Sequence, residues 1–414
     1  MSASRLRLFH GWQVVVAAVV GAALSPATLV NVPFSLFVSA LEADVHWGRP
    51  TITAALSVFL ALLVVSLPIA GWLVDRVGAR RVALPSILAY GLALASIRWI
   101  APSPVQLYVH YGLIAILGAG AQSLTFVRVL SAWFDRRRGL AIGACMAGYG
   151  LGYFLVPIVT QALIARHGWR TAYGGLGALA VFGAFPIVAL LLRDAPTQSG
   201  PAPDARLRNW QPAMTWSSDE IRKLLSSREL WLMGLTFLLM SAALNGVQSQ
   251  LVPLLTDEHM DAVRAAWMLS VVGLGSFPAR LLIGLLLDRV FAPFVAVAFF
   301  VPSAVALLWL ADGWVPPAVA LCAIAIGLSL GAENDLLGYL VGRYFDLKWF
   351  ARIYSVLLAT YLLGAALGPY LMARAYAAAG SYNGVLRAGS VAIGVSCALL
   401  LCLRRYPLGV PRDA

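Results

Sequence analysis

The sequence is poor in charged residues and in the side-chain sets that most enzymes use. Only 12% of its 414 residues are charged and 61% are hydrophobic, whereas a soluble domain carries about 25% charged residues. Its four cysteines, Cys145, Cys322, Cys397 and Cys402, have no metal-binding spacing. The sequence also lacks a nucleophile motif and a phosphate-binding loop. We therefore expect neither an enzyme nor a bound cofactor or metal.

No histidine lies near the middle of an apolar run, where a membrane transporter could use it to carry a proton. The five histidines fall near the ends of apolar runs or between them: His10, His46, His110, His167 and His259. A carboxyl group is therefore the expected carrier of any proton inside the membrane. We expect no cleavable signal peptide, because the first apolar run is too long for one. The tails are too short for a soluble signalling domain, which disfavours a sensor.

Long apolar runs dominate the chain. A membrane-spanning helix needs about 20 such residues, and the mean hydropathy of +0.83 is high. We predict an all-α membrane protein with twelve spans. They cover residues 12–40, 51–74, 82–100, 105–130, 139–165, 171–192, 229–256, 262–287, 291–311, 316–342, 350–374 and 382–403.

The net charge of +12 follows the predicted topology. If both termini are cytoplasmic, the inner loops and tails hold 21 of the 30 Lys and Arg residues and the outer loops hold six. This asymmetry is the positive-inside rule, and it predicts a multi-pass protein of a bacterial cytoplasmic membrane with both termini inside. Because no contiguous basic face exists, nucleic acid is not an expected partner.

The chain repeats itself at an offset of about 212 residues. Gly71-Trp-Leu-Val-Asp75-Arg76-Val77 returns as Gly284-Leu-Leu-Leu-Asp288-Arg289-Val290, and Gly168 aligns with Gly380. Two halves of six spans are the plan of a secondary transporter, with its site between the halves. We predict one six-helix bundle at 1–192, a Pro-rich cytoplasmic linker at 193–228 and a second bundle at 229–414.

A loop motif follows the second span. It reads Gly71-x-x-x-Asp75-Arg76-x-Gly78-x-Arg80-Arg81 and resembles the loop 2–3 signature of the major facilitator superfamily. We expect Asp75 to meet a helix N-terminus or an arginine of the other half, and Arg80 to meet Asp135. These residues either form a conformational latch or merely set topology. The latch candidates are Gly71, Asp75, Arg76, Gly78, Arg80, Arg81, Asp135, Asp288 and Arg289.

The fifth span begins with a more specific motif. The stretch from Trp133 through Phe134-Asp135-Arg136-Arg137-Arg138-Gly139-Leu140-Ala141 to Gly152 is similar to the signature of monocarboxylate transporters, and the oxalate/formate antiporters share much of it. The resemblance implies transport of small organic anions, usually carboxylates.

Arg280 is the main substrate-binding candidate. It lies eight residues before Asp288, about 12 Å along a helix, and so near mid-membrane. The pattern Arg280-x-x-x-Gly284-x-x-x-Asp288 resembles the helix 8 motif of the same families, whose arginine binds the substrate carboxylate. A guanidinium matches a carboxylate with two parallel hydrogen bonds. The alternative is a structural arginine held by a buried acid.

Two acids lie deep in the tenth span. Glu333 is ten residues before Arg343 and aligns with Gln122 of the first half, while Asp335 is about 200° further around the helix. We expect Glu333 to face the cavity with Arg280 and to carry the coupled proton, and Asp335 to be a structural partner. The reverse assignment stays open. Further pocket candidates, each equally plausible as a contact between helices, are Thr28, Asn31, Asn245, Gln248, Tyr149, Tyr153 and Tyr361.

The chain also departs from these families. Ser276 stands where animal monocarboxylate transporters have an aspartate, and the eleventh span has no cation between Tyr361 and Pro369, so one carboxylate per substrate is expected. The first hypothesis is proton-coupled symport of a lactate- or pyruvate-like monocarboxylate by alternating access, by a monomer whose partners are the anion, protons and lipid. The alternatives are an anion exchanger of the oxalate/formate type and an exporter of a larger acidic metabolite.

Overall fold

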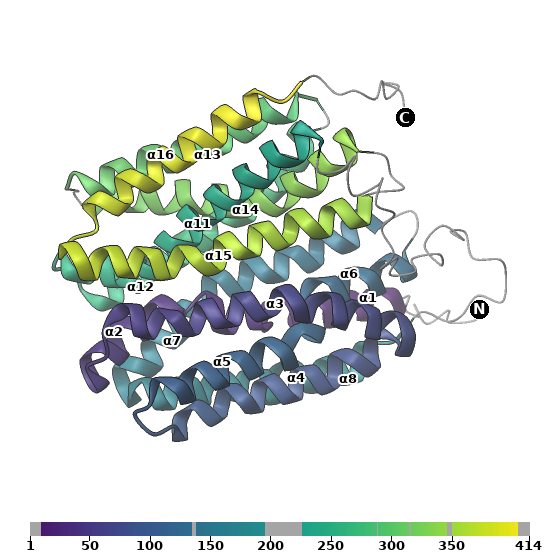
Figure 1. The fold of residues 1–414 in the computed structure, drawn as a ribbon. Helices are drawn as coiled ribbons and strands as arrows, with labels where there is room; N and C mark the ends of the chain where they lie inside the picture. Colours follow the sequence, from purple (N-terminus) through teal and green to yellow (C-terminus); the bar gives the residue numbers. More distant parts are fainter. Residues whose placement is uncertain are drawn as a thin grey trace, which may run out of the picture.

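The computed structural model describes residues 10–134, 138–194, 226–287, 289–313, 316–345 and 350–404. These residues form helices without any β-strand, and the helices run alongside one another (Figure 1). The first half contains α1 (His10–Ala23), η1 (Ala27–Asn31), α2 (Phe34–Val45), α3 (Arg49–Val77), α4 (Ala79–Ser96), η2 (Ile97–Trp99), α5 (Pro104–Gly118), η3 (Ala119–Ala121), α6 (Ser123–Trp133), α7 (Arg138–Ala178), η4 (Leu179–Ala184) and α8 (Phe185–Leu191).

The second half contains six long helices. They are α11 (Arg228–Asp257), α12 (Ala262–Leu287), α13 (Ala292–Ala311), α14 (Pro316–Tyr344), α15 (Phe350–Ala379) and α16 (Asn383–Leu401). We call the end of the bundle where α2 and α11 end and α3 begins the distal face. The opposite end, where α1 begins and α16 ends, is the terminal face.

Eleven helical segments of the described residues are long and apolar enough to cross a membrane. One of them, Leu140–Leu191, has 52 residues, which would be about 78 Å as a straight helix, far beyond a bilayer of about 30 Å. Gly168 interrupts it with φ of 78°, in the region that favours glycine. The segment is therefore two spans joined at Gly168, and the predicted twelve-helix fold is confirmed.

The spans of helices 1 and 4 are broken, which the sequence analysis did not predict. The first is divided into α1, η1 and α2, and the fourth into α5, η3 and α6. The two breaks face each other, because a Cβ added at Gly118 would lie 2.6 Å from Cγ of Pro26. Tyr90 donates a hydrogen bond to the carbonyl of Leu24, so one backbone group freed by a break is satisfied. The equivalent helices of the second half, α11 and α14, are continuous.

The buried apolar side chains form two clusters, one from each half. The first consists of residues between 14 and 192 together with Ala365 and Ala366, and the second of residues between 230 and 403 together with Leu36. Residues 195–225, which include most of the proposed linker, lie outside the described residues. The boundaries at 192 and 229 stay predictions.

The backbone repeats the offset seen in the sequence. Gly168 and Gly380 both have positive φ, at 78° and 68°, and so do His46 and His259, at 53° and 64°. These are turns at the distal face after the fifth and first spans of each half. The glycine pair and the histidine pair therefore both indicate that the chain follows the same path through each half.

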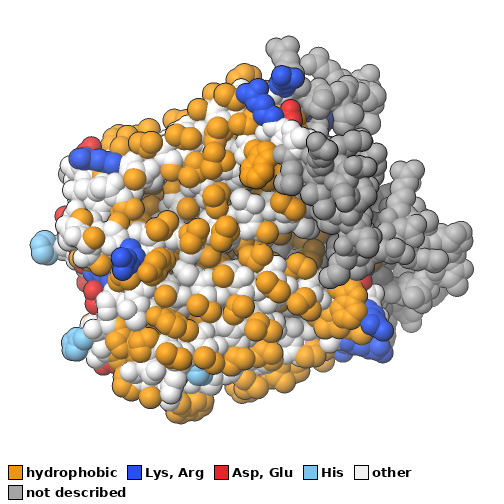
Figure 2. Space-filling view, viewed as in Figure 1, with side chains coloured by type: hydrophobic (Ala, Val, Ile, Leu, Met, Phe, Trp, Pro, Cys, Tyr) orange, Lys and Arg blue, Asp and Glu red, His pale blue; other side chains and the backbone are white. Residues whose placement is uncertain are grey.

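The surface matches a membrane environment. Figure 2 shows hydrophobic side chains covering the middle of the molecule, with charged side chains and histidines mostly toward the two ends. Many large apolar residues are exposed, among them Phe182 (79%) and Leu190 (73%). A soluble monomer rarely exposes so much apolar surface, and lipid is the solvent that suits it.

Packing between α11 and α15 should not tolerate a methyl group at Gly368. A Cβ there would overlap the carbonyl oxygen of Ala242, and overpacking costs about 1–3 kcal/mol. We expect Gly368→Ala to lower the midpoint of thermal unfolding in detergent. Gly394→Ala is the matched control, because a Cβ there meets nothing within 4 Å. Equal midpoints for the two variants would contradict this account.

Candidate functional site

Arg280 lies at the contact between the two halves. It sits on α12, partly buried, seven residues before the end of the helix. Its Nη1 is 3.8 Å from the Sδ atom of Met146 on α7. The guanidinium therefore reaches from the second half to a helix of the first half. Methionine sulfur is a weak acceptor, so much of the arginine's donor capacity is left for another ligand.

The two acids of α14 have different surroundings. Glu333 is completely buried, and its carboxylate oxygens accept no hydrogen bond of ordinary geometry from the described residues. Tyr361 lies close enough to interact with it. Asp335 is partly exposed and is the acid that interacts electrostatically with Arg280. Asp335 is therefore the acid whose charge interacts with that of Arg280, and the expectation that Glu333 faces the cavity stays a prediction.

Tyrosines join these charged residues into one group. Tyr153 on α7 interacts with both Arg280 and Glu333. Tyr361 on α15 interacts with Glu333 and with Asn245 of α11. Asn245 donates to the carbonyl of Ser241 over 3.0 Å. These interactions link one cation, two carboxyl groups, two phenols and an amide, a group that we call the Arg280 cluster. Its members come from α7 of the first half and from α11, α12, α14 and α15 of the second, and α7 packs against α12.

Three other polar candidates cannot be assigned to the cluster by contact. Gln248 on α11 is buried, and its Nε2 has no hydrogen-bond partner among the described residues. Gln122, the repeat partner of Glu333, lies at the break of helix 4, where its backbone is extended. Asn31 ends η1 and is partly buried. They stay predictions as pocket residues.

Two candidates point into the first half instead. Thr28 donates a hydrogen bond to the carbonyl of Ser25 over 2.9 Å. Tyr149 is buried with Ser25 and Ser123 beside its hydroxyl. Both residues stabilise the broken region of helices 1 and 4. Tyr149 and Tyr153 are four residues apart on α7, so they differ by a rotation of about 40° and a rise of about 6 Å. This small difference places them in different surroundings, and the sequence alone does not predict it.

The loop motif holds the first half together at the terminal face. Asp75 forms an ion pair with Arg128 of α6, so its partner is an arginine of the same half and not of the other half as expected. Arg80 donates to the carbonyl of Ala189 over 2.7 Å, and Asp194 accepts from the backbone N–H of Ala79 over 3.0 Å.

The remaining latch residues divide between turns and exposed positions. Gly78 has φ of 95°, Gly71 packs near Leu124, and the Arg76 guanidinium lies 5.3 Å from the ring centre of Trp72. Arg81 and Arg289 are exposed. Asp135 and Asp288 lie outside the described residues, so the Arg80–Asp135 pair stays a prediction.

The Asp75–Arg128 pair gives a test of coupling within the first half. We expect Asp75→Asn and Arg128→Gln each to lower thermal stability, and the double variant to lose less than the two losses added together, because either change alone already breaks the pair. Unfolding of all four proteins in one detergent measures this cycle. Strict additivity would mean that the pair contributes nothing.

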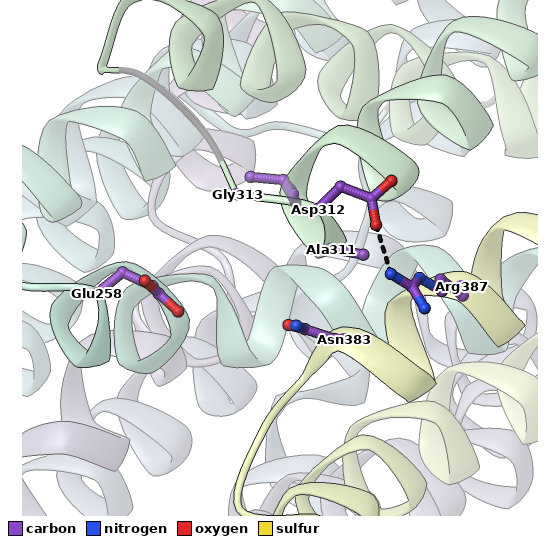
Figure 3. Close-up of a pocket in the computed structure, with 7 residues that line it drawn as sticks. Glu258, Ala311, Asp312, Gly313, Asn383 and Arg387 are labelled. Atoms are coloured by element: carbon purple, nitrogen blue, oxygen red, sulfur yellow. Dashed lines mark hydrogen bonds and ion pairs between the residues drawn. The ribbon is translucent and has the colours of Figure 1, made fainter.

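A surface pocket lies away from this cluster. It is an open hollow of about 310 Å³ at the distal face of the second half. Figure 3 shows Arg387 of α16 paired with Asp312 beside it. The two groups are 2.6 Å apart and 60% exposed. The residues that line this pocket include none of the predicted site residues.

A protein family and several individual proteins are similar in sequence to this chain over most of its length. The family described as Major Facilitator Superfamily matches residues 18–369. The uncharacterized MFS-type transporter YhjX of Escherichia coli (strain K12) is 25% identical over 340 residues, 80% of each chain. Monocarboxylate transporter 11 of Homo sapiens is 28% identical over 342 residues, covering 79% of this chain and 69% of that protein.

Solved structures share the fold. A bacterial homolog of the human lysosomal transporter Spinster superposes with a TM-score of 0.71 at 17% identity, over 96% of this chain and 97% of that one. The nucleoside transporter NupG gives a TM-score of 0.75 at 14% identity, over 96% of this chain and 100% of that one. With a family match over most of its length and this twelve-helix fold, the chain belongs to the Major Facilitator Superfamily and is a multi-pass membrane transporter.

Proposed function

We propose that this transporter carries a small monocarboxylate together with a proton by alternating access. The observation that supports it most is Arg280, a partly buried guanidinium at the contact between the halves whose contact in the first half is a methionine sulfur. Such a group costs roughly 3 kcal/mol or more to place in a membrane, and a substrate carboxylate would give it a bidentate partner. Relatives that include a human monocarboxylate transporter support the same substrate class.

The carboxyl groups of the Arg280 cluster supply a route for coupling. Asp335 offsets the charge of Arg280 in the empty site, and a substrate anion would compete with it for the guanidinium. A second negative charge favours proton uptake by a nearby carboxyl, and Glu333 is the buried group with no strong partner. Anion and proton would then bind together and cross together. No catalytic residue and no metal is part of this proposal.

The proposed orientation places both termini in the cytoplasm. In the predicted topology, 21 of the chain's 30 Lys and Arg residues fall in the cytoplasmic loops and tails, as the positive-inside rule requires. The distal face would then look outward from a cytoplasmic membrane. We propose that the monomer is the working unit, because the Arg280 cluster is built from one chain.

Uptake by purified protein in lipid vesicles tests the function. Labelled lactate or pyruvate should accumulate when the outside is acidic, and an ionophore that abolishes the pH gradient should abolish accumulation. Exchange of internal for external anion without any effect of the pH gradient would instead indicate an anion exchanger. Absence of uptake for every monocarboxylate, with uptake of a larger acid, would identify a transporter of larger acidic metabolites.

A further inference from the structure

A buried arginine joins the two halves at the distal face. Arg49, the first residue of α3, is only 7% exposed. Its Nη1 and Nη2 donate to the two carboxylate oxygens of Asp257 over 2.5 and 2.7 Å. Asp257 is the last residue of α11, so this bidentate pair links the first half to the second. Its Nε also donates to Glu42 of α2 over 2.8 Å.

Aromatic residues of the second half cover the same guanidinium. Its Cζ atom lies 4.2 Å from the ring centre of Tyr376, and Tyr376 stacks on Tyr382 with ring centres 4.4 Å apart. Nη1 donates to the hydroxyl of Tyr382 over 2.7 Å. Burial raises the pKa of Tyr382, which keeps this hydroxyl protonated so that it can donate onward. Arg49 therefore holds two elements of the second half at once.

A ring of hydrogen bonds continues the contact below the arginine. Tyr382 donates to Gln250 over 3.1 Å, Gln250 donates to Thr53 over 3.0 Å, and Thr53 donates to the carbonyl of Arg49 over 2.6 Å. Gln250 and Thr53 are fully buried. On the same helix as Gln250, the backbone N–H of Val252 donates to Ser35 of α2 over 2.8 Å. These bonds close the distal end between the halves.

We propose that the Arg49–Asp257 pair is the gate of the distal face, a pair that breaks and re-forms once in each transport cycle. The inference rests on the alternating access proposed above. A transporter must separate its halves at each face in turn, and this pair is a charged contact between them whose arginine is buried and whose aspartate is 30% exposed. Removing either partner leaves the other without its main contact. The balance of states should then shift toward opening of the distal face.

Cysteine labelling in detergent tests the gate without any substrate. After the four native cysteines are replaced, Ser35→Cys reports the distal side, because its side chain is fully buried between the halves. Gly143→Cys reports the other side, since it lies three residues from Met146 toward the terminal face and a Cβ there meets nothing within 4 Å. Arg49→Gln and Asp257→Asn should each raise the labelling rate at position 35 on the order of tenfold and lower it at position 143. The Arg49→Gln, Asp257→Asn double variant should show the same labelling rates at both positions as each single variant.

A matched control uses the other ion pair of the same face. Arg387→Gln breaks the exposed Arg387–Asp312 pair, whose partners both belong to the second half, and should change neither reporter. Unchanged labelling in Arg49→Gln, or an equal rise in Arg387→Gln, would overturn the proposal. Faster labelling at both reporters would show a loosened fold and would overturn it too. Failure of anion uptake in the parent protein would affect the proposed function and leave this test intact.

Discussion

Replacing Arg280 by lysine is expected to weaken anion binding strongly although the charge is kept. The ammonium group lacks the planar fork that binds a carboxylate with two parallel bonds. Losing such a charge-assisted pair costs about 2–4 kcal/mol, or roughly 30- to 700-fold in Kd. Stabilisation of the purified protein by a panel of organic acids, followed by titration with the best one, measures the change.

The control for this variant is a second arginine within a span. Arg128 on α6 is half exposed and pairs with Asp75 inside the first half, away from the Arg280 cluster. Arg128→Lys should leave the anion Kd unchanged. Normal binding and transport by Arg280→Ala would show that the anion is held elsewhere. A matching loss in Arg128→Lys would point to a general loss of structure instead.

Replacing Glu333 by glutamine is expected to abolish accumulation driven by a pH gradient. Glutamine imitates the protonated carboxyl, so the site should still bind the anion and exchange it, with little dependence on pH. The proposed function links proton and anion binding in the parent protein, and such linkage is reciprocal. Acid pH should therefore tighten anion binding, and bound anion should raise proton affinity. Uptake and exchange in lipid vesicles, each with and without a pH gradient, separate these two activities.

Asp335→Asn is the decisive comparison, because Asp335 is on the same helix and interacts with Arg280. If Glu333 carries the proton, Asp335→Asn keeps gradient-driven accumulation even if its anion Kd changes. Loss of accumulation in Asp335→Asn with survival in Glu333→Gln would assign the proton to Asp335. Survival in both variants would indicate that the undissociated acid itself is carried.

Much of the fold could be predicted from the sequence because lipid imposes a simple rule. Each span must be apolar and about 20 residues long, and the predicted limits of spans such as 262–287 agree with α12 (Ala262–Leu287). The repeat predicted equivalent turns, and Gly168 and Gly380 share a positive φ. The broken helices could not be predicted. They depend on contacts such as that of Gly118 with Pro26, between spans far apart in the chain.

The candidate charged residues of the site could be selected from the sequence, but which of them lie next to one another could not. Charges in a membrane are rare, so Arg280, Glu333 and Asp335 could be selected individually. Which acid faces the cavity depends on the rotation of α14, so the choice between Glu333 and Asp335 stays a prediction. Arg49 appeared only as one of the outer-loop charges, because its partner Asp257 is 208 residues away and no local motif connects the two. The aligned histidines His46 and His259 likewise mark turns that their residue type does not predict.

The three charged groups of the Arg280 cluster, Arg280, Glu333 and Asp335, all belong to the second half, and this has an electrical consequence. With every group ionised, one guanidinium and two carboxyls sum to a charge of minus one. Any displacement of that charge along the membrane normal does work against the membrane voltage, up to about 2.3 kcal/mol per 100 mV for a complete crossing. A single resident proton makes the empty site neutral and removes that work. The proposed symport, however, releases that proton together with the anion, so the empty carrier would return with a charge of minus one and its return would depend on the membrane voltage.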